Sequence, residues 1–157
     1  MIEKYILVAL VSMVPLIELR AGVPIAVGMG LPYWHSLVIC ALCNMIPVPI
    51  IYFFARKVLI WGADKKHIGK IFTFFLVKGE KAGQKLTASA GRGGLFVALM
   101  LFVGIPLPGT GAWTGTLAAS FLNMGFKSTV AAVCLGVVMA GMIMGLASTG
   151  VFSVIGL

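Results

Sequence analysis

Charged residues are scarce in this chain. Only 10% of its 157 residues are Asp, Glu, Lys or Arg, whereas 61% are hydrophobic, and the mean hydropathy is +1.11. A soluble domain carries about a quarter charged residues, so a soluble globular enzyme is excluded, and a disordered chain is excluded by the same numbers. The alternating segments of roughly ten residues that a membrane β-barrel needs are absent too. The composition therefore predicts an all-α integral membrane protein.

Cysteine and nucleotide-binding motifs are also sparse or missing. The three cysteines do not make a disulfide framework, and the C-x-x-C pair Cys40 and Cys43 lies inside an apolar run, which favours buried packing over a metal or redox site. No G-x-x-x-x-G-K-[ST] loop is present, so this chain does not use ATP itself. A membrane enzyme is disfavoured because Glu18 has no second carboxylate at membrane depth as a partner. We expect no metal and no cofactor.

The basic charge is concentrated in one segment. Between Arg56 and Arg92 lie nine basic and two acidic residues, which account for almost all of the net charge of +8. Because apolar segments flank this stretch, we interpret the charge as a topology signal that places residues 56–92 in the cytoplasm, and not as a site for nucleic acid. Its apolar residues recur at helical spacing, which predicts a basic amphipathic helix that contacts anionic lipid headgroups. The lysines expected at the lipid surface are Lys65, Lys66, Lys70, Lys78, Lys81 and Lys85.

Apolar segments of unequal length precede the basic segment. Residues 5–17 would form a helix of about 20 Å, too short for a hydrocarbon core of about 30 Å. A charged, helix-breaking interruption follows at residues 18–24, then a second short piece, and then residues 36–55, which are long enough for one full span. The helix breaks are expected at Pro15, Pro24, Pro47 and Pro49. The apolar N-terminal piece has no basic start, which argues against a cleaved signal peptide.

The same order returns after the basic segment. A short apolar piece at 94–105, a break at 106–111, a second short piece and a long span at 128–157 follow one another. We therefore predict a single membrane domain, residues 1–157, built as an inverted repeat of residues 1–55 and 93–157. Each half is a broken, re-entrant helical hairpin plus one transmembrane helix. We expect the protein in the cell (inner or plasma) membrane. Each half crosses it an odd number of times, so both termini lie outside when the segment between the halves is cytoplasmic.

Glu18 and Arg20 are the strongest candidates for a functional site. The predicted hairpin places them deep in the membrane, where a charge costs about 2.5–3.5 kcal/mol and marks an ion or substrate path. A mutual ion pair that fixes the break is the structural alternative. The second break offers backbone groups and neutral side chains instead, and we expect freed carbonyls to bind cations and the following helix amides to bind anions. The remaining candidates for the substrate or ion site are Asn44, Pro106, Pro108, Gly109, Thr110, Gly111, Trp113 and Thr114.

Three motifs resemble one known family. The sequences PLIELRAGVP at 15–24, NMIPVP at 44–49 and IPLPGTGAWTG at 105–115 are similar to those of the bacterial and archaeal small multidrug export proteins. The resemblance runs over essentially the whole chain and implies export of small molecules. A more distant similarity to DedA-type membrane proteins implies paired re-entrant hairpins and movement of phospholipid or undecaprenyl phosphate. Those proteins generally carry charges in both hairpins, whereas the second hairpin here is neutral.

Three hypotheses follow. The leading one is a secondary transporter that exports small molecules and is coupled to protons or cations, with one site near the midplane between two opposed hairpins. The second is a DedA-like lipid flippase in which Arg20 and helix amides hold a phosphate, and the third is a non-transporting assembly subunit. The G-x-x-x-G pair Gly141 and Gly145 suggests close helix packing, within a subunit or in a homodimer.

Overall fold

The computed structural model describes residues 2–14, 17–65, 69–107 and 109–155, and every regular element in these ranges is a helix. Pro15, Lys66 and Pro108 lie outside the described residues. The elements are α1 (Ile2–Met13), α2 (Glu18–Gly28), α3 (Tyr33–Met45), α4 (Pro47–Ala63), α5 (Gly69–Gly104), α6 (Ala112–Phe121) and α7 (Phe126–Ile155). The prediction of an all-helical chain is confirmed.

Two long apolar helices dominate the molecule. The stretches Tyr33–Ala63 and Phe126–Gly150 are each long and apolar enough to cross a membrane. The first consists of α3 and α4, which meet at Ile46 with helical backbone angles, so Pro47 marks a local interruption and not a turn of the chain. The amide of Ile46 donates to the carbonyl of Cys43 at 3.3 Å. Pro47 therefore does not leave this carbonyl free, because a tighter i to i−3 bond replaces the missing one.

Two predicted boundaries are wrong. Residues 18–24 were expected to interrupt the helix, but they form the first turns of α2, and Pro24 lies inside it. The interruption comes earlier, between Met13 and Glu18. The basic segment and the apolar piece at 94–105 were expected as separate elements, but α5 contains both and turns sharply at Gly91, where φ is 70° and ψ is 174°.

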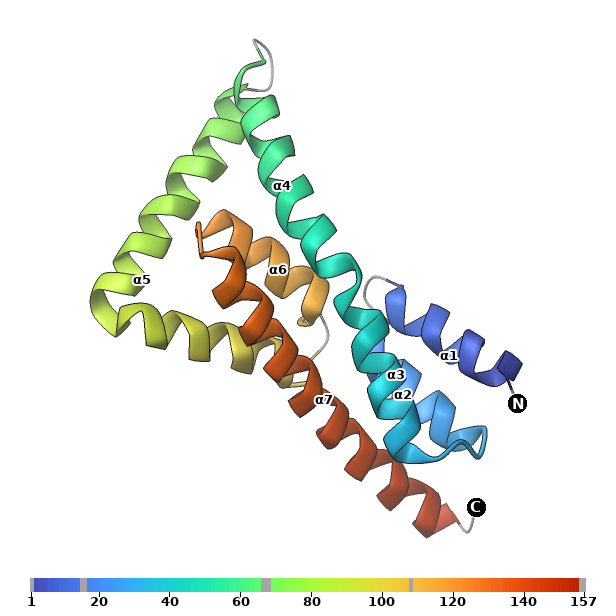
Figure 1. The fold of residues 1–157 in the computed structure, drawn as a ribbon. Coiled ribbons are helices and arrows are strands. Elements are labelled where there is room, and N and C mark those ends of the chain that lie inside the picture. Colours follow the sequence, from blue (N-terminus) through green and yellow to red (C-terminus); the bar gives the residue numbers. More distant parts are fainter. Residues whose placement is uncertain (1, 15–16, 66–68, 108, 156–157) are drawn as a thin grey trace.

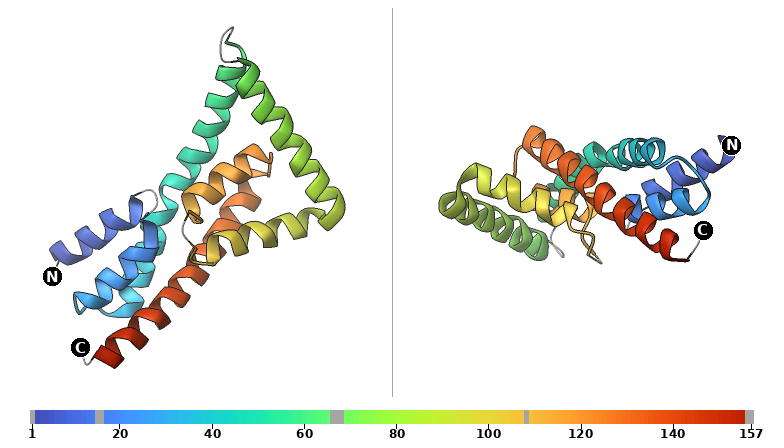
Figure 2. Two further views of the ribbon diagram at one scale, coloured as in Figure 1. Left: turned by 180° about the vertical axis from the view of Figure 1, so that it is seen from behind. Right: turned by 90° about the horizontal axis from the view of Figure 1, so that it is seen from below.

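The helices form a triangular frame beside a three-helix group. Figure 1 shows α4 and the two limbs of α5 as the sides of the triangle, with α6 inside it, while α1, α2 and α3 lie together near the lower part of α7. Both views in Figure 2 place the N-terminal end of α1 and the C-terminal end of α7 on the same side of the molecule. The last turn of α4 and the first turn of α5 lie at the opposite end.

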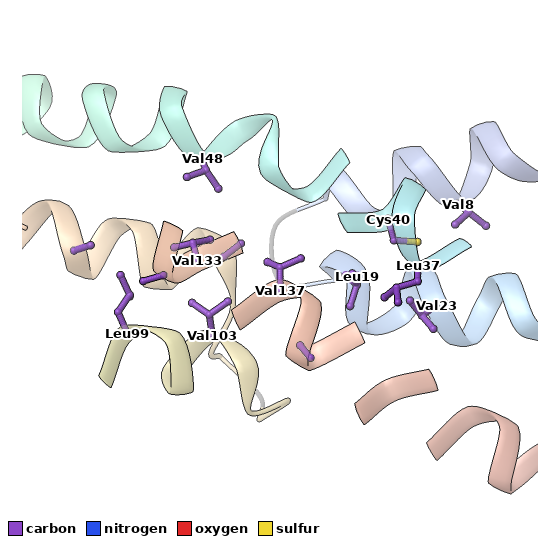
Figure 3. Close-up of a cluster of buried hydrophobic side chains, with 14 of the residues drawn as sticks. Val8, Leu19, Val23, Leu37, Cys40, Val48, Leu99, Val103, Val133 and Val137 are labelled. Atoms are coloured by element: carbon purple, nitrogen blue, oxygen red, sulfur yellow. The ribbon is translucent and has the colours of Figure 1, made fainter. Parts of the chain in front are cut away.

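One buried apolar cluster joins the two groups of helices. Figure 3 shows Val8, Leu19 and Val23 packing near Leu37 and Cys40 on one side, and Val103 near Val133 and Val137 on the other. Small residues permit the close approach of α5 and α7, because a Cβ at Gly136 would lie 2.7 Å from the carbonyl oxygen of Met100. Each of these helices uses one apolar face for this cluster.

The G-x-x-x-G pair packs within the chain. A Cβ at Gly141 would lie 2.2 Å from the Leu37 side chain, and one at Gly145 would lie 2.1 Å from the Tyr33 ring. The Tyr33 hydroxyl also donates to the carbonyl of Gly141 at 3.3 Å. Both glycines therefore serve the α3–α7 contact, and they lend no support to a homodimer.

The outer surface of the molecule is strongly apolar. Large hydrophobic side chains such as Leu146 (76% exposed), Ile2 (75%) and Trp34 (69%) face outward, together with many others on every long helix. A water-soluble monomer rarely exposes continuous apolar surface of this kind. Lipid is the solvent that suits such a surface, in agreement with the two membrane-length helices.

Candidate functional site

The first chain break places Glu18 at the start of α2. The amide of Glu18 donates to the carbonyl of Val14 at 3.0 Å, and Glu18 itself has a φ of 52°, in the left-handed region that residues other than glycine adopt rarely. Its side chain is buried, with 4% of the residue exposed. A buried carboxylate needs hydrogen-bond donors, because its desolvation is costly otherwise.

The second chain break supplies those donors. After α5 ends at Gly104, the chain makes short backbone bonds from Leu107 to Ile105 and from Thr110 to Leu107, and α6 begins at Ala112. The residue before the helix is Gly111, which has no side chain to cap the first amides. The first amides of a helix lack partners within the helix and carry partial positive charge.

Glu18 caps α6 across the molecule. The amide of Ala112 donates to one carboxylate oxygen of Glu18, and the amide of Trp113 donates to the other, both at 3.0 Å. The two partners are 94 and 95 residues away in sequence. We predicted that these amides would attract an anion; the anion they bind in this structure is the protein's own carboxylate.

Gly111 is fitted to this contact. Its φ of 153° lies in the region that favours glycine, and a Cβ at this position would be 2.4 Å from a carboxylate oxygen of Glu18. The same residue therefore provides both the backbone turn into α6 and the space for the carboxylate. We call the contacts of Glu18 and Arg20 with residues 105–113 the junction.

Arg20 bonds to the second break as well. One guanidinium nitrogen donates to the carbonyl of Leu107, and another donates to the Thr110 hydroxyl at 2.6 Å. The Thr110 hydroxyl in turn lies 2.9 Å from the carbonyls of Ile105 and Leu107, to one of which it can donate its proton. These bonds occupy carbonyls that were expected to bind a cation.

The two charges do not pair with each other. Within the described residues, Glu18 and Arg20 form no ion pair, since each is directed to a different part of the second break. The alternative in which a mutual ion pair fixes the first break is therefore not what this structure contains. The two charges instead hold both breaks together.

Not every predicted site residue joins the junction. The Thr114 hydroxyl donates to the Gly111 carbonyl at 3.5 Å, within its own turn. Pro106 and Gly109 lie between α5 and α6, and Gly109 has a positive φ. Asn44 is 1% exposed at the end of α3, and among the described residues its side chain bonds to neither break. Its carbonyl oxygen and the indole nitrogen of Trp113 are buried and have no hydrogen-bond partner in the described part of the chain. Such groups are rare in proteins and suit a bound water or ligand group.

A cavity adjoins the junction that the sequence did not indicate. It has a volume of about 340 Å³ and lies between α4, α5 and α6. Trp113, Leu117 and Phe121 form one wall, at the i, i+4 and i+8 spacing of a helix face. Phe72 of α5 and apolar residues of α4 form the others. Periodicity in α6 could have indicated the wall, but the approach of Phe72 depends on the bend at Gly91.

The chain matches a family model described as "Putative small multi-drug export protein" over residues 18–143. It belongs to this family. The matched range begins at Glu18, directly after the first break, and includes the second break. The assignment agrees with the resemblance found in the sequence. No curated protein and no solved structure matches the chain.

Family membership and the two long apolar helices together indicate a membrane protein. The family description names multi-drug export, which is a transport activity. Among the described residues no cluster of His, Cys, Asp or Glu could hold a metal ion.

Proposed function

We propose that this member of the small multi-drug export family is a secondary transporter whose access changes at the junction. The observation that carries the proposal is the Glu18 carboxylate, buried and bonded to two backbone amides at the start of α6. An ionisable residue buried among apolar helices is a functional candidate by default. The apolar cavity beside Trp113 would receive the apolar part of a small substrate.

In the proposed cycle, Glu18 alternates between the α6 amides and a proton or cation. A protonated carboxyl has lost its charge and one acceptor position, so it caps the helix less well. The released amides of Ala112 and Trp113 would then be available to a substrate oxygen. Because each ligand changes the affinity for the other, proton or cation binding would be coupled to substrate binding.

Arg20 would keep the two breaks close while Glu18 is released. Its bonds to Leu107 and Thr110 do not involve the carboxylate. Asn44 and Trp113, each with a buried polar atom that lacks a partner among the described residues, would contribute further contacts to substrate or water.

We further propose that the two short helical pairs re-enter the membrane from opposite faces, as halves of an inverted repeat. Helices α1, α2 and α6 have 12, 11 and 10 residues, so none reaches across a core of about 30 Å. Residues 56–92 would be cytoplasmic and both termini outside. A homodimer would help to enclose the site.

The lipid flippase remains the second candidate, but it has less support. It requires Arg20 and the α6 amides to hold a lipid phosphate, and here those amides bind Glu18 while Arg20 binds Leu107 and Thr110. A non-transporting subunit would need no buried carboxylate at all. Movement of a labelled lipid phosphate by the purified protein would favour the flippase.

The transporter is tested by replacing Glu18 with Gln. The amide side chain keeps the size of Glu18, but it cannot exchange a proton and brings an N–H donor to one of the two helix amides. We expect Glu18→Gln to abolish proton-driven flux of a fluorescent cationic dye in proteoliposomes. The dye is a small molecule whose aromatic rings are apolar, and these rings could enter the cavity.

The controls are Glu18→Asp and Glu3→Gln. The first keeps a carboxylate and should retain measurable flux. The second removes the exposed carboxylate of α1 and should leave flux unchanged. Unchanged proton-driven flux in the Glu18→Gln protein would remove Glu18 from the mechanism.

A further inference from the structure

A basic cavity is lined by the last residue of α4, by Asp64 and Lys65, and by the first turns of α5. Figure 1 shows that this end of α4 and α5 is far from the start of α6, where the junction lies. The volume of the cavity is about 810 Å³. Lys65 follows α4, and Lys70, Lys78 and Lys81 lie along one face of α5. Among the described lining residues Asp64 is the one acidic residue, so these residues carry an excess of three positive charges.

The four lysines are available to an external anion. All four are exposed, and within the described residues none of them forms an ion pair with a carboxylate. Two of them have aromatic neighbours instead. The ammonium of Lys65 lies 4.6 Å from the centre of the Trp61 ring, and that of Lys78 lies 4.9 Å from the centre of the Phe74 ring. Cation–π contacts of this kind position an ammonium group without neutralising it.

Apolar side chains continue from the lysines along the same cavity. Phe74 is 56% exposed and Val77 is 44% exposed, and both belong to the lining. A free inorganic anion would make no favourable contact with these apolar side chains. A lipid has both components, since its phosphate carries negative charge and its acyl chains cover apolar side chains.

The wall of the cavity is held by close contacts between the two helices. A Cβ at Gly62 would lie 2.4 Å from the ring of Phe72, and one at Gly69 would lie 2.6 Å from the carbonyl oxygen of Ala63. The Gly69 amide also donates to the Lys65 carbonyl at 2.7 Å. The spacing of Lys65 from the lysines of α5 is therefore fixed by packing.

We propose that this cavity binds the phosphate headgroup of one anionic phospholipid, whose acyl chains lie against Phe74 and Val77. The cavity lysines form a specific site for one lipid. A basic surface without such a cavity would attract anionic lipids only non-specifically. The proposal does not depend on what the protein transports.

The experiment compares two triple variants that remove equal charge. Lys70, Lys78 and Lys81 are replaced by Gln in the cavity variant, and the exposed Lys57, Lys85 and Lys127, none of which lines the cavity, are replaced by Gln in the control. Native mass spectrometry of the purified proteins measures the affinity for phosphatidylglycerol and for phosphatidylcholine with the same acyl chains.

Wild type should prefer phosphatidylglycerol. Each lysine close to an anionic headgroup contributes about fivefold in affinity, so the cavity variant should lose about a hundredfold and the control about threefold or less. A Lys→Arg triple variant at the cavity positions should retain the preference, which keeps the test decisive if the Gln variant misfolds.

Two results would overturn the proposal. Equal losses in the cavity and control variants would mean diffuse attraction to the basic segment. Complete displacement of phosphatidylglycerol by an excess of inorganic phosphate, with no contribution from the acyl chains, would mean that the cavity takes a free anion and not a lipid.

Discussion

Gly111 is the residue on which the junction most directly depends. It enters α6 with a backbone conformation that favours glycine, and the carboxylate of Glu18 occupies the space that a side chain would need. Gly109, two residues earlier, also has a positive φ, of 81°, but a Cβ there would meet nothing within 4 Å. An alanine at Gly109 would therefore introduce backbone strain alone, whereas an alanine at Gly111 would also disrupt the contact with Glu18.

We expect Gly111→Ala to lower the stability by about 2–4 kcal/mol, because strain and loss of the α6 cap add. Gly109→Ala should cost about 1 kcal/mol, from strain alone. Thermal unfolding of both variants in the same detergent checks the difference. Similar losses in the two would show that Glu18 does not hold α6.

The sequence indicated the residues of the junction better than their contacts. Proline and glycine content located the second break, and the rarity of buried charge singled out Glu18 and Arg20. The pairing of Glu18 with Ala112 and Trp113 was not predictable, because it depends on a left-handed backbone at Glu18 and on the packing of helices some 90 residues apart. Helix periodicity carries no information on either.

Among the helices, the kink of α5 at Gly91 has the largest effect on the shape of the frame. Its first limb meets α4 at one corner and then diverges from it, and its second limb packs on α7, so the turn at Gly91 creates two sides of the triangular frame (Figure 1). The φ and ψ of Gly91 are accessible to almost no other residue. Gly93, by contrast, is helical and also has open space around its Cα.

Gly91→Ala should therefore lower the stability by about 1–3 kcal/mol, and Gly93→Ala should raise it by about 0.5–1 kcal/mol. The melting temperatures of the purified variants would move in opposite directions. If both substitutions stabilised the protein, α5 would be a straight helix in the membrane.

Element boundaries were harder to predict than element types. Pro24 was taken as a helix breaker, but it lies in the seventh position of α2, where it removes only one amide donor, the partner of the Arg20 carbonyl. Gly91 was not singled out among 20 glycines, because the sequence does not show which of them adopts a positive φ. The basic segment and the following apolar piece were therefore predicted as two separate elements.

At the scale of the whole molecule, the start of α1 and the end of α7 lie opposite the corner where α4 ends and α5 begins (Figure 2). This arrangement supports the proposed topology, in which the basic segment is cytoplasmic and the termini are outside. Lysines are concentrated at the corner where α4 ends and α5 begins, in agreement with the preference of positive charge for the cytoplasmic side.

The topology predicts the side from which single cysteines are labelled. In a variant with Cys40, Cys43 and Cys134 replaced by Ala, Lys78→Cys should react with a membrane-impermeant maleimide only in inverted vesicles. Glu3→Cys should react only in intact spheroplasts. Labelling of both positions from the same side would contradict the inverted repeat.

The capping of α6 by a carboxylate so far upstream also bears on biosynthesis. The ribosome must add 95 further residues between Glu18 and Trp113, which takes roughly 5–20 s at ordinary rates of synthesis. Throughout that interval the nascent chain holds an acidic group in the translocon or the bilayer without its eventual donors. Quality-control proteases would therefore meet the protein at its most vulnerable before its last two helices emerge.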